Sequence, residues 1–123
     1  SSLRLAVTGA APTPVELVHR MRSELGFTSV IKAYGLTESC GTVSICLPGD
    51  SPETIANSDG AAIPDTEVKL VDAEGKEVPR GTAGEVWVRG YNVMRGYFKD
   101  EAETKKAIDA EGWLHTGDIA VMD

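Results

Sequence analysis

The chain has 123 residues, of which 41% are hydrophobic and 25% are charged, so it can bury a core and is not a disordered tail. Its net charge is −7 at pH 7, and the sequence shows no stripe of clustered Lys and Arg, which excludes a nucleic-acid surface. The apolar runs are too short for a transmembrane segment, and the first residues lack the pattern of a signal peptide.

Two cysteines, Cys40 and Cys46, lie six residues apart on an apolar segment. Along a strand this spacing is roughly 20 Å, too far for a disulfide unless the chain folds back. Two cysteines alone do not make a zinc site either. We therefore interpret both as small hydrophobic side chains in a reducing compartment, and we expect a cytoplasmic protein.

The first part of the chain follows a strand–helix–strand pattern. Residues 3–8 predict one strand and residues 27–33 predict another. Between them, Thr13 is the expected N-cap of an amphipathic helix, with proline at the next position, and Gly26 is its expected stop. Such units place their strands in parallel in an α/β sheet. The loops that follow the two strands are then expected at the same sheet edge, where ligands bind.

The rest of the chain is expected to be rich in short strands. A polar segment, 48–57, is predicted to be a surface loop between an α/β part at 1–47 and a β-rich part at 58–123. The β-rich part is predicted to form a small antiparallel barrel or sheet. Its expected elements are strands at 66–72, 76–79 and 84–89 and a helix from Asp100 to about Ile108; a short strand is also expected at 42–47.

The segment Tyr34–Ser39 (Tyr-Gly-Leu-Thr-Glu-Ser) follows a predicted strand directly and carries the strongest chemical signal. A glycine beside an aromatic residue lets the backbone approach a flat ligand on which the ring can stack. Thr37 offers a hydroxyl suited to a phosphate oxygen, and Glu38 offers a carboxylate suited to Mg²⁺. These residues indicate a metal–nucleotide site, while composition alone fits an ordinary loop equally well.

A second segment, 112–118 (Gly-Trp-Leu-His-Thr-Gly-Asp), places Asp118 on an expected tight turn between apolar stretches. A carboxylate there can accept hydrogen bonds from both hydroxyls of a ribose. Taken alone, the pattern favours an aspartate that stabilises its own turn. Glu85 and Arg89 lie two pleats apart on one expected strand face, where a structural role is favoured over a catalytic one.

Five motifs, taken in order, resemble the adenylate-forming superfamily, which contains acyl-CoA synthetases, luciferases and peptide-synthetase adenylation domains. They are Thr-Gly-Ala-Ala-Pro (8–12), Tyr-Gly-Leu-Thr-Glu (34–38), Gly-Glu-Val-Trp-Val-Arg-Gly (84–90), Gly-Tyr-Phe (96–98) and Trp-Leu-His-Thr-Gly-Asp (113–118). The resemblance implies that a carboxylic acid, such as a fatty acid, reacts with ATP and Mg²⁺ to form an acyl adenylate. Pyrophosphate leaves, and CoA then takes the acyl group as a thioester.

The resemblance also implies roles for individual residues. Thr37 and Glu38 are the expected catalytic pair, with Thr37 near the α-phosphate and Glu38 as the metal ligand. Asp118 is expected to bind the ribose hydroxyls. The expected adenine contacts are Gly9, Ala10, Ala11, Tyr34 and Gly35, and the residues expected to border the acyl pocket are Gly35, Leu36 and Gly41.

Two expectations concern the rest of such an enzyme. The family's phosphate-binding loop and its mobile C-terminal domain with a catalytic Lys are expected outside these residues, so the chain alone is expected to be inactive and to bind ATP weakly. Leu36 stands where peptide-synthetase domains tend to carry Pro, which favours a CoA ligase or a luciferase. The alternatives are a domain that loads a carrier protein and a non-catalytic binding or scaffold module.

Overall fold

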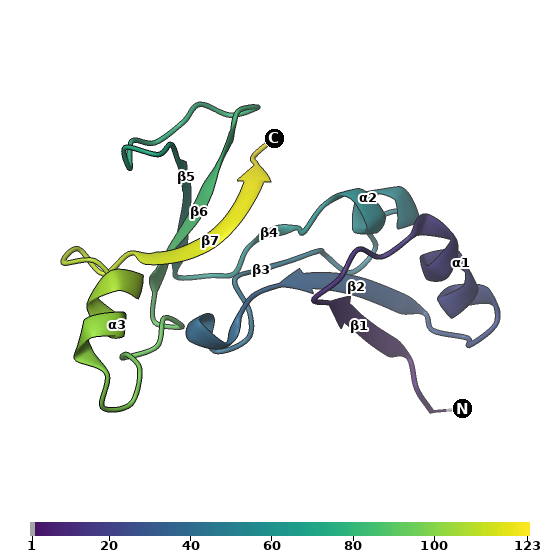
Figure 1. The fold of residues 1–123 in the computed structure, drawn as a ribbon. Coiled ribbons are helices and arrows are strands. Elements are labelled where there is room, and N and C mark those ends of the chain that lie inside the picture. The colour runs from purple at the N-terminus through teal and green to yellow at the C-terminus, as the bar shows by residue number, and fades with distance from the viewer. Residues whose placement is uncertain (1) are drawn as a thin grey trace. The chain divides into compact units, whose positions relative to one another are not determined.

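The computed structural model describes residues 2–123, which divide into two compact units (Figure 1). The first unit runs to Leu36 and resumes over Gly41–Ile63; the second comprises Thr37–Cys40 and Pro64–Asp123. The division of the chain into parts at 1–47 and 58–123, joined by residues 48–57, stays a prediction. The segment 37–40 groups with the second unit because the Met94 amide donates a hydrogen bond to the Glu38 carbonyl, at 2.8 Å.

The first unit contains a four-stranded sheet of order β1-β2-β3-β4. Its strands are β1 (Leu5–Gly9), β2 (Ser29–Tyr34), β3 (Ser44–Ile45) and β4 (Ala61–Ala62). Strands β1 and β2 are parallel, whereas β2–β3 and β3–β4 are antiparallel. The predicted strand–helix–strand unit is therefore confirmed, and the ends of β1 and β2 lie at one sheet edge because Gly9 pairs with Ala33.

Helix α1 (Val15–Ser23) links the two parallel strands, but its start differs from the prediction. Pro14, not Thr13, occupies the N-cap position, and no side chain caps the helix there. The Thr13 hydroxyl instead lies 3.4 Å from the hydroxyl of Thr8, so the side chain is turned toward the strand and cannot cap. The expected stop is confirmed: Gly26 has a φ of +72°, and the Phe27 amide donates to the Met21 carbonyl at 3.2 Å.

Residues 52–57 form helix α2 (Pro52–Asn57), so the prediction of a loop over 48–57 is wrong for these residues. Ser51 caps the helix, because its hydroxyl oxygen accepts a hydrogen bond from the Thr54 amide at 3.0 Å. Ile55 is fully buried and belongs to the core of the first unit, which comprises Val18, Val30, Cys46 and Ile55. The sequence of this segment is mostly polar, so its pattern does not reveal that one isoleucine side chain is buried in the core.

The second unit is built on a three-stranded antiparallel sheet, β5-β6-β7. Its strands are β5 (Thr66–Val71), β6 (Ala83–Gly90) and β7 (Leu114–Val121), and the helix is α3 (Glu101–Ala107). Asp100 caps α3 as predicted, since its carboxylate accepts from the Glu103 amide at 3.0 Å. The sheet is open over residues 2–123, so the expected barrel is not formed by the part of the chain that the structure describes.

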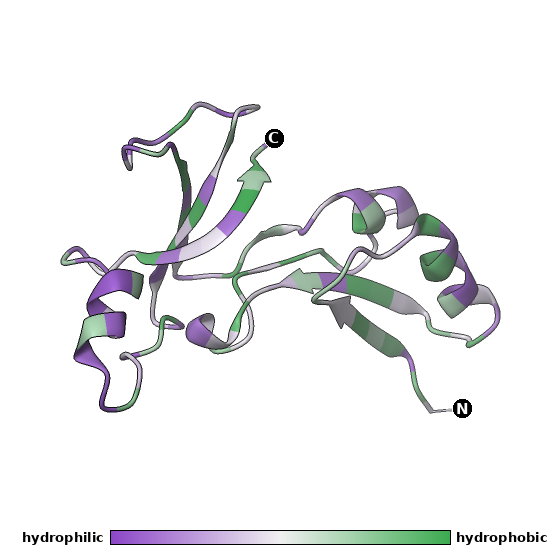
Figure 2. Cartoon of the chain, in the orientation of Figure 1, coloured by the Kyte–Doolittle hydropathy of each residue, from purple (hydrophilic) through white to green (hydrophobic). Residues whose placement is uncertain are grey.

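The strand expected at 76–79 is reduced to an isolated bridge between Glu77 and Val71. The Asp72 carboxylate accepts from the amides of Glu74 and Lys76, which closes a tight turn, and Pro79 has no amide to extend the pairing. Buried side chains alternate along β6, and the buried apolar set of the second unit is Leu70, Val71, Val86, Val88, Trp113 and Leu114. Figure 2 shows hydrophobic and hydrophilic residues on different sides of α1, as an amphipathic helix requires.

None of the helices among residues 2–123 has the length and apolar character needed to cross a membrane. Cys40 is exposed and Cys46 is buried, and both are free thiols. Burial raises the pKa of the Cys46 thiol, which keeps it protonated at neutral pH. Cys46 therefore behaves as the small core side chain that the sequence predicted, whereas Cys40 does not.

Candidate functional site

The residues predicted to contact adenine occupy the edge of the first sheet. Gly9 ends β1, and Ala10 and Ala11 follow it as an exposed bend. Ala10 has a φ of +63°, a left-handed conformation that a residue with a Cβ adopts only when its surroundings hold it there. This strained bend lies beside the end of β2, since Gly9 pairs with Ala33 and Tyr34 is the next residue.

The second predicted loop folds back tightly on itself. The Gly41 amide donates to the Leu36 carbonyl at 3.1 Å, and the Val43 amide donates to the Tyr34 carbonyl at 2.8 Å. A Cβ on Gly35 would overlap the carbonyl oxygen of Gly41, so only glycine fits this approach. The fold thus brings together Gly35, Leu36 and Gly41, the three residues expected to border an acyl pocket; that role stays a prediction.

Thr37–Ser39 form a single 3-10 turn, η1, within the second unit. Thr37 is exposed, Ser39 is fully buried, and Cys40 closes the turn with a φ of +53° and a 3.0 Å bond from its amide to the Thr37 carbonyl. Glu38 is held at two points. Its carbonyl accepts from the Met94 amide, and its carboxylate Oε1 accepts from the hydroxyl of Tyr97, each at 2.8 Å.

The contact between Glu38 and Tyr97 is one that the sequence did not predict, because 59 positions separate the two residues. The hydrogen bond to the Glu38 carboxylate raises the pKa of the Tyr97 hydroxyl, and desolvation and the charge of Glu38 act in the same direction. Tyr97 therefore stays protonated and donates to the carboxylate throughout the neutral range. Only the Gly-Tyr-Phe motif at 96–98 signalled its importance.

Asp118 lies within strand β7 and not on a tight turn between strands, which corrects the prediction. Gly117 has a φ of +75°, and the pairing of β6 with β7 shifts register between Glu85 and Trp87. The resulting bulge is fixed by side chains: the Thr116 hydroxyl donates to the Val86 carbonyl at 2.8 Å, and the Gly117 amide donates to the Glu85 carboxylate at 3.0 Å. Asp118 follows this bulge at an exposed position.

Glu85 thus supports the bulge before Asp118, a role that the strand pattern did not reveal. Its expected partner on the strand face, Arg89, forms two 2.9 Å hydrogen bonds to Glu67 instead. The register explains this pairing because Glu67 lies directly opposite Arg89 on the neighbouring strand. The expectation of a structural role for Arg89 is confirmed, with a different partner.

Aromatic and cationic side chains stack along the second sheet. The ring centroids of Trp87 and His115 lie 3.7 Å apart, and the angle between the two ring planes is 9°. Lys69 Nζ lies 4.1 Å from the ring centroid of Trp113. Asp109 accepts from the Trp113 amide at 2.9 Å and lies 3.4 Å from His115. Burial alone would raise the pKa of Asp109, but hydrogen bonds from the Trp113 amide, His115 and the Glu111 amide outweigh it and lower that pKa.

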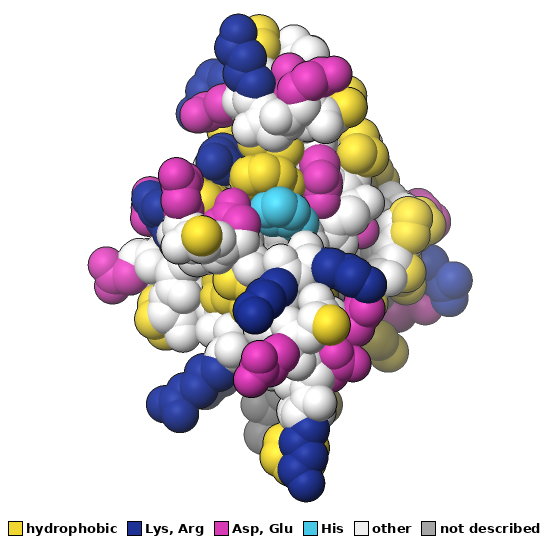
Figure 3. Space-filling model, turned by 60° about the vertical axis from the view of Figure 1, so that its left-hand side comes forward, with side chains coloured by type: hydrophobic (Ala, Val, Ile, Leu, Met, Phe, Trp, Pro, Cys, Tyr) yellow, Lys and Arg dark blue, Asp and Glu magenta, His cyan; other side chains and the backbone are white. Residues whose placement is uncertain are grey.

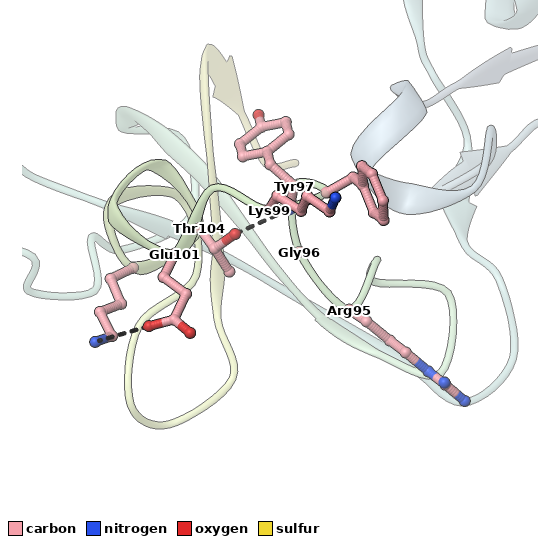
Figure 4. Close-up of a pocket in the computed structure, with 8 residues that line it drawn as sticks. Arg95, Gly96, Tyr97, Lys99, Glu101 and Thr104 are labelled. Atoms are coloured by element: carbon pink, nitrogen blue, oxygen red, sulfur yellow. Dashed lines mark hydrogen bonds and ion pairs between the residues drawn. The ribbon is translucent and has the colours of Figure 1, made fainter.

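A shallow pocket of about 370 Å³ lies between α3 and the segment that precedes it (Figure 4). Its lining includes Arg95, Tyr97, Phe98 and Lys99. Figure 4 shows the Tyr97 side chain pointing away from Arg95.

On the face in Figure 3, acidic and basic side chains are interspersed, so no region of one charge stands out there.

The donor set fits Mg²⁺ bound together with a substrate. Mg²⁺ prefers oxygen ligands and is usually held by one or two carboxylates plus phosphate oxygens and water. The carboxylate of Glu38 and the exposed hydroxyl of Thr37 provide oxygens of that kind on one turn. Over residues 2–123 there is no group of three or more His, Cys, Asp or Glu side chains that could hold an ion.

Known proteins are similar to this chain in sequence and in fold. A family model described as AMP-binding enzyme matches residues 1–98. The chain is 50% identical over its whole length to a CoA ligase of Rhodococcus jostii (strain RHA1), 3-[(3aS,4S,7aS)-7a-methyl-1,5-dioxo-octahydro-1H-inden-4-yl]propanoyl:CoA ligase, and it covers 22% of that protein.

Two solved structures carry the same fold. The amide bond synthetase McbA from Marinactinospora thermotolerans is 35% identical with a TM-score of 0.86, over 99% of this chain and 24% of that one. O-succinylbenzoate coenzyme A synthetase (MenE) from Bacillus subtilis, in complex with ATP and magnesium ion, is 32% identical with a TM-score of 0.79, over 98% of this chain and 24% of that one.

The mixed α/β fold and the motif order define an adenylate-forming protein. The chain belongs to the AMP-binding family of adenylate-forming acyl- and aryl-CoA ligases. Its curated relatives include acid–thiol ligases, and the chain spans about a fifth of the Rhodococcus protein, at 22% of its length.

Proposed function

We propose that this chain supplies part of the nucleotide site of an ATP-dependent carboxylic acid–CoA ligase. A carboxylate oxygen of the acid attacks the α-phosphorus of ATP, the bond to the bridging oxygen of the β-phosphate breaks, and pyrophosphate leaves with that electron pair. The CoA sulfur then attacks the acyl carbon, the acyl–oxygen bond breaks, and AMP leaves as the thiol loses its proton. Both reactive partners in each step belong to substrates, so the chain's own residues bind and orient.

The observation that carries the proposal is the fixed carboxylate of Glu38 on the Thr37–Ser39 turn. Glu38 would hold Mg²⁺, which supplies charge stabilisation at the phosphates when it is bound. A carboxylate accepts several hydrogen bonds on its two oxygens, so the bond from the Tyr97 hydroxyl to Oε1 is compatible with metal coordination. The Thr37 hydroxyl is proposed to donate a hydrogen bond to an α-phosphate oxygen.

The adenosine contacts are proposed for the remaining motif residues. Tyr34 would stack on adenine beside Gly35, and the bend at Gly9, Ala10 and Ala11 would lie along it. The left-handed conformation of Ala10, with a φ of +63°, supports a functional role because strain of this kind gathers at binding sites. The Asp118 carboxylate would accept hydrogen bonds from the ribose hydroxyls, and the adjacent bulge fixes the position of Asp118.

The identity of the acid is left at the level of a carboxylic acid. The Rhodococcus relative is named for an indenyl propanoate and MenE for o-succinylbenzoate, so neither singles out a fatty acid. The acceptor is proposed to be CoA on the strength of the relative at 50% identity. An amine acceptor is the second candidate, since an amide bond synthetase shares this fold at 35% identity.

The nucleotide role can be tested on the chain itself. Mg·ATP is titrated into ¹⁵N-labelled chain while amide chemical shifts are followed, with Glu38→Ala, Asp118→Ala and the exposed-turn control Glu74→Ala. We expect shifts at Tyr34–Glu38 and near Asp118 that each site variant weakens and the control preserves. The same small shifts in all four proteins would contradict the proposal and favour a scaffold module.

A further inference from the structure

The Gly-Tyr-Phe motif at 96–98 has no role in the proposed chemistry, yet Tyr97 reaches Glu38. The Tyr97 hydroxyl donates to Glu38 Oε1 at 2.8 Å, within the second unit of the chain. A partly exposed glutamate on a short turn otherwise samples several rotamers, because its side chain has three rotatable bonds. A hydrogen bond from a neutral hydroxyl restricts those rotamers without cancelling the negative charge.

The backbone of Tyr97 is itself held in place by helix α3. The Tyr97 amide donates to the Thr104 hydroxyl at 2.9 Å, and that hydroxyl donates to the Asp100 carbonyl at 2.7 Å, so the residue is tied to the first turns of the helix (Figure 4). A Cβ on Gly96 would lie 2.7 Å from Thr104 Cγ2, closer than side chains pack. Glycine at 96 is what lets the tyrosine backbone approach α3 closely.

The turn that bears Glu38 has a separate anchor. The Met94 amide donates to the Glu38 carbonyl at 2.8 Å, and this bond involves only backbone atoms. Two contacts therefore act on one residue: Met94 holds the backbone of Glu38, and Tyr97 holds its carboxylate. Removing the Tyr97 hydroxyl should free the side chain while the turn keeps its place.

We propose that Tyr97 is a positioning residue that orients the Glu38 carboxylate for Mg²⁺. The inference rests on the proposed function, since Glu38 is a metal ligand only under that proposal. Groups that hydrogen-bond to metal ligands fix the ligand's orientation, and their loss typically weakens metal binding by about 10- to 100-fold. We expect an effect at the lower end, because Tyr97 is 40% exposed and water can replace its hydroxyl in part.

The test uses Mn²⁺ in the presence of ATP as the probe on the whole 123-residue chain, because the site fits a metal that phosphate oxygens also hold. Paramagnetic broadening of amide signals detects even weak sites, and the amides of Glu38 and Ser39 report this one. Four proteins are compared: wild type, Tyr97→Phe, Glu38→Gln, and the matched control Tyr91→Phe, since Tyr91 is 73% exposed. Hydrogen exchange of the Met94 amide reports whether the turn itself is intact.

We expect Tyr97→Phe to need about tenfold more Mn²⁺ for half-broadening than wild type, with unchanged Met94 protection. Tyr91→Phe should match wild type, and Glu38→Gln should lose local broadening. If Glu38→Gln loses it but Tyr97→Phe matches Tyr91→Phe, the positioning role is overturned and the proposed function stands. If wild type and Glu38→Gln broaden alike, the metal role of Glu38 fails and the inference fails with it.

A loss of Met94 protection in Tyr97→Phe would also overturn the proposal, since Tyr97 would then support the turn and not the carboxylate. A second variant tests independently whether the contact between Thr104 and the Tyr97 amide contributes to positioning Glu38. Thr104→Val removes the hydroxyl that fixes the Tyr97 amide, and we expect a smaller rise, about threefold, well below the loss of a complete contact. Thr104→Ser keeps the hydroxyl and should restore wild-type broadening.

Discussion

Both units bury an apolar core, and in the second unit several carboxylates also fix local geometry. Val18, Val30 and Ile55 are fully buried around the parallel strands of the first unit. In the second unit, carboxylates fix local geometry: Glu85 at the bulge, Asp109 at Trp113, and Glu67 at Arg89. Apolar packing has no preferred direction, whereas hydrogen bonds do. The stability of the two units should therefore respond differently to changes in side-chain volume and in pH.

The largest expected effect is that of Ile55→Ala in the first core. Ile55 has no exposed surface, and its truncation leaves a cavity beside Val18 and Val30, which costs about 2–5 kcal/mol of unfolding free energy. Hydrogen exchange of the β2 amides measures this loss. Leu47→Ala is the control, because Leu47 is 61% exposed and should cost less than about 0.5 kcal/mol. Equal losses in both variants would contradict a stabilising role for this core.

Gly35→Ala should be the next most disruptive change. Its Cβ would meet the Gly41 carbonyl oxygen, a backbone atom that cannot rotate away, so we expect a loss of about 1–3 kcal/mol by overpacking. Denaturation followed by far-UV circular dichroism measures it. Gly49→Ala is a stringent control, since Gly49 has a φ of +100° but open space around it. Because Gly35 does not have a positive φ, a loss in Gly35→Ala below that in Gly49→Ala would contradict the close-approach explanation.

Asp109→Asn sharpens the comparison in the second unit. The native pKa of Asp109 lies below its unfolded value, so its contribution is present above the unfolded pKa and is lost as pH falls through the native one. At pH 7 we expect a loss of about 1–3 kcal/mol, as for hydrogen bonds to a charged group. Both tryptophans, Trp87 and Trp113, lie in this unit, so fluorescence-detected denaturation reports it.

The matched control for Asp109→Asn is Glu74→Gln, a change at an exposed turn residue. Wild type and Asp109→Asn should converge in stability as the solution is acidified below the native pKa of Asp109. A wild-type advantage that instead grows on acidification would reverse the sign of this account. It would mean that Asp109 is destabilised as a carboxylate in the folded state.

The smallest expected effect is that of Glu67→Gln. The hydrogen bonds from Arg89 lower the pKa of Glu67, so its contribution is present above the unfolded pKa and is lost as pH falls through the native one. Both partners are exposed, and salt screens such pairs. The difference in denaturation midpoint between wild type and Glu67→Gln should be small at pH 7 and should shrink in 0.5 M NaCl. A difference that grows with salt would contradict it.

The parts of the fold that sequence could predict are those with local signals. The strand–helix–strand unit follows from apolar periodicity and from Gly26, and α3 from its cap at Asp100. Helix α2 was missed because only Ile55 in its six residues is buried, too little for a periodic pattern. The start of α1 was missed because Thr13 points to Thr8, a contact that the local sequence does not reveal.

The same division applies to the candidate site. Glu38, Tyr34 and Asp118 could be selected because each lies in a short motif whose residue types suit a nucleotide or a metal. Tyr97 and Glu85 could not, since their contacts to Glu38 and Gly117 join residues 59 and 32 positions apart. Their roles depend on strand register and on the close approach at Gly96, which only the three-dimensional structure reveals.

The most direct test of the account places these residues in a complete ligase. The chain aligns over 123 residues with the Rhodococcus jostii relative, so it can replace the corresponding segment of that enzyme. ATP–pyrophosphate exchange with that enzyme's named acid is measured for the hybrid, for Glu38→Gln, and for the control Glu103→Gln on α3. The account predicts an active hybrid, a control that matches it, and a loss of at least about 100-fold for Glu38→Gln. An inactive hybrid, or exchange by Glu38→Gln at the rate of the control, would contradict it.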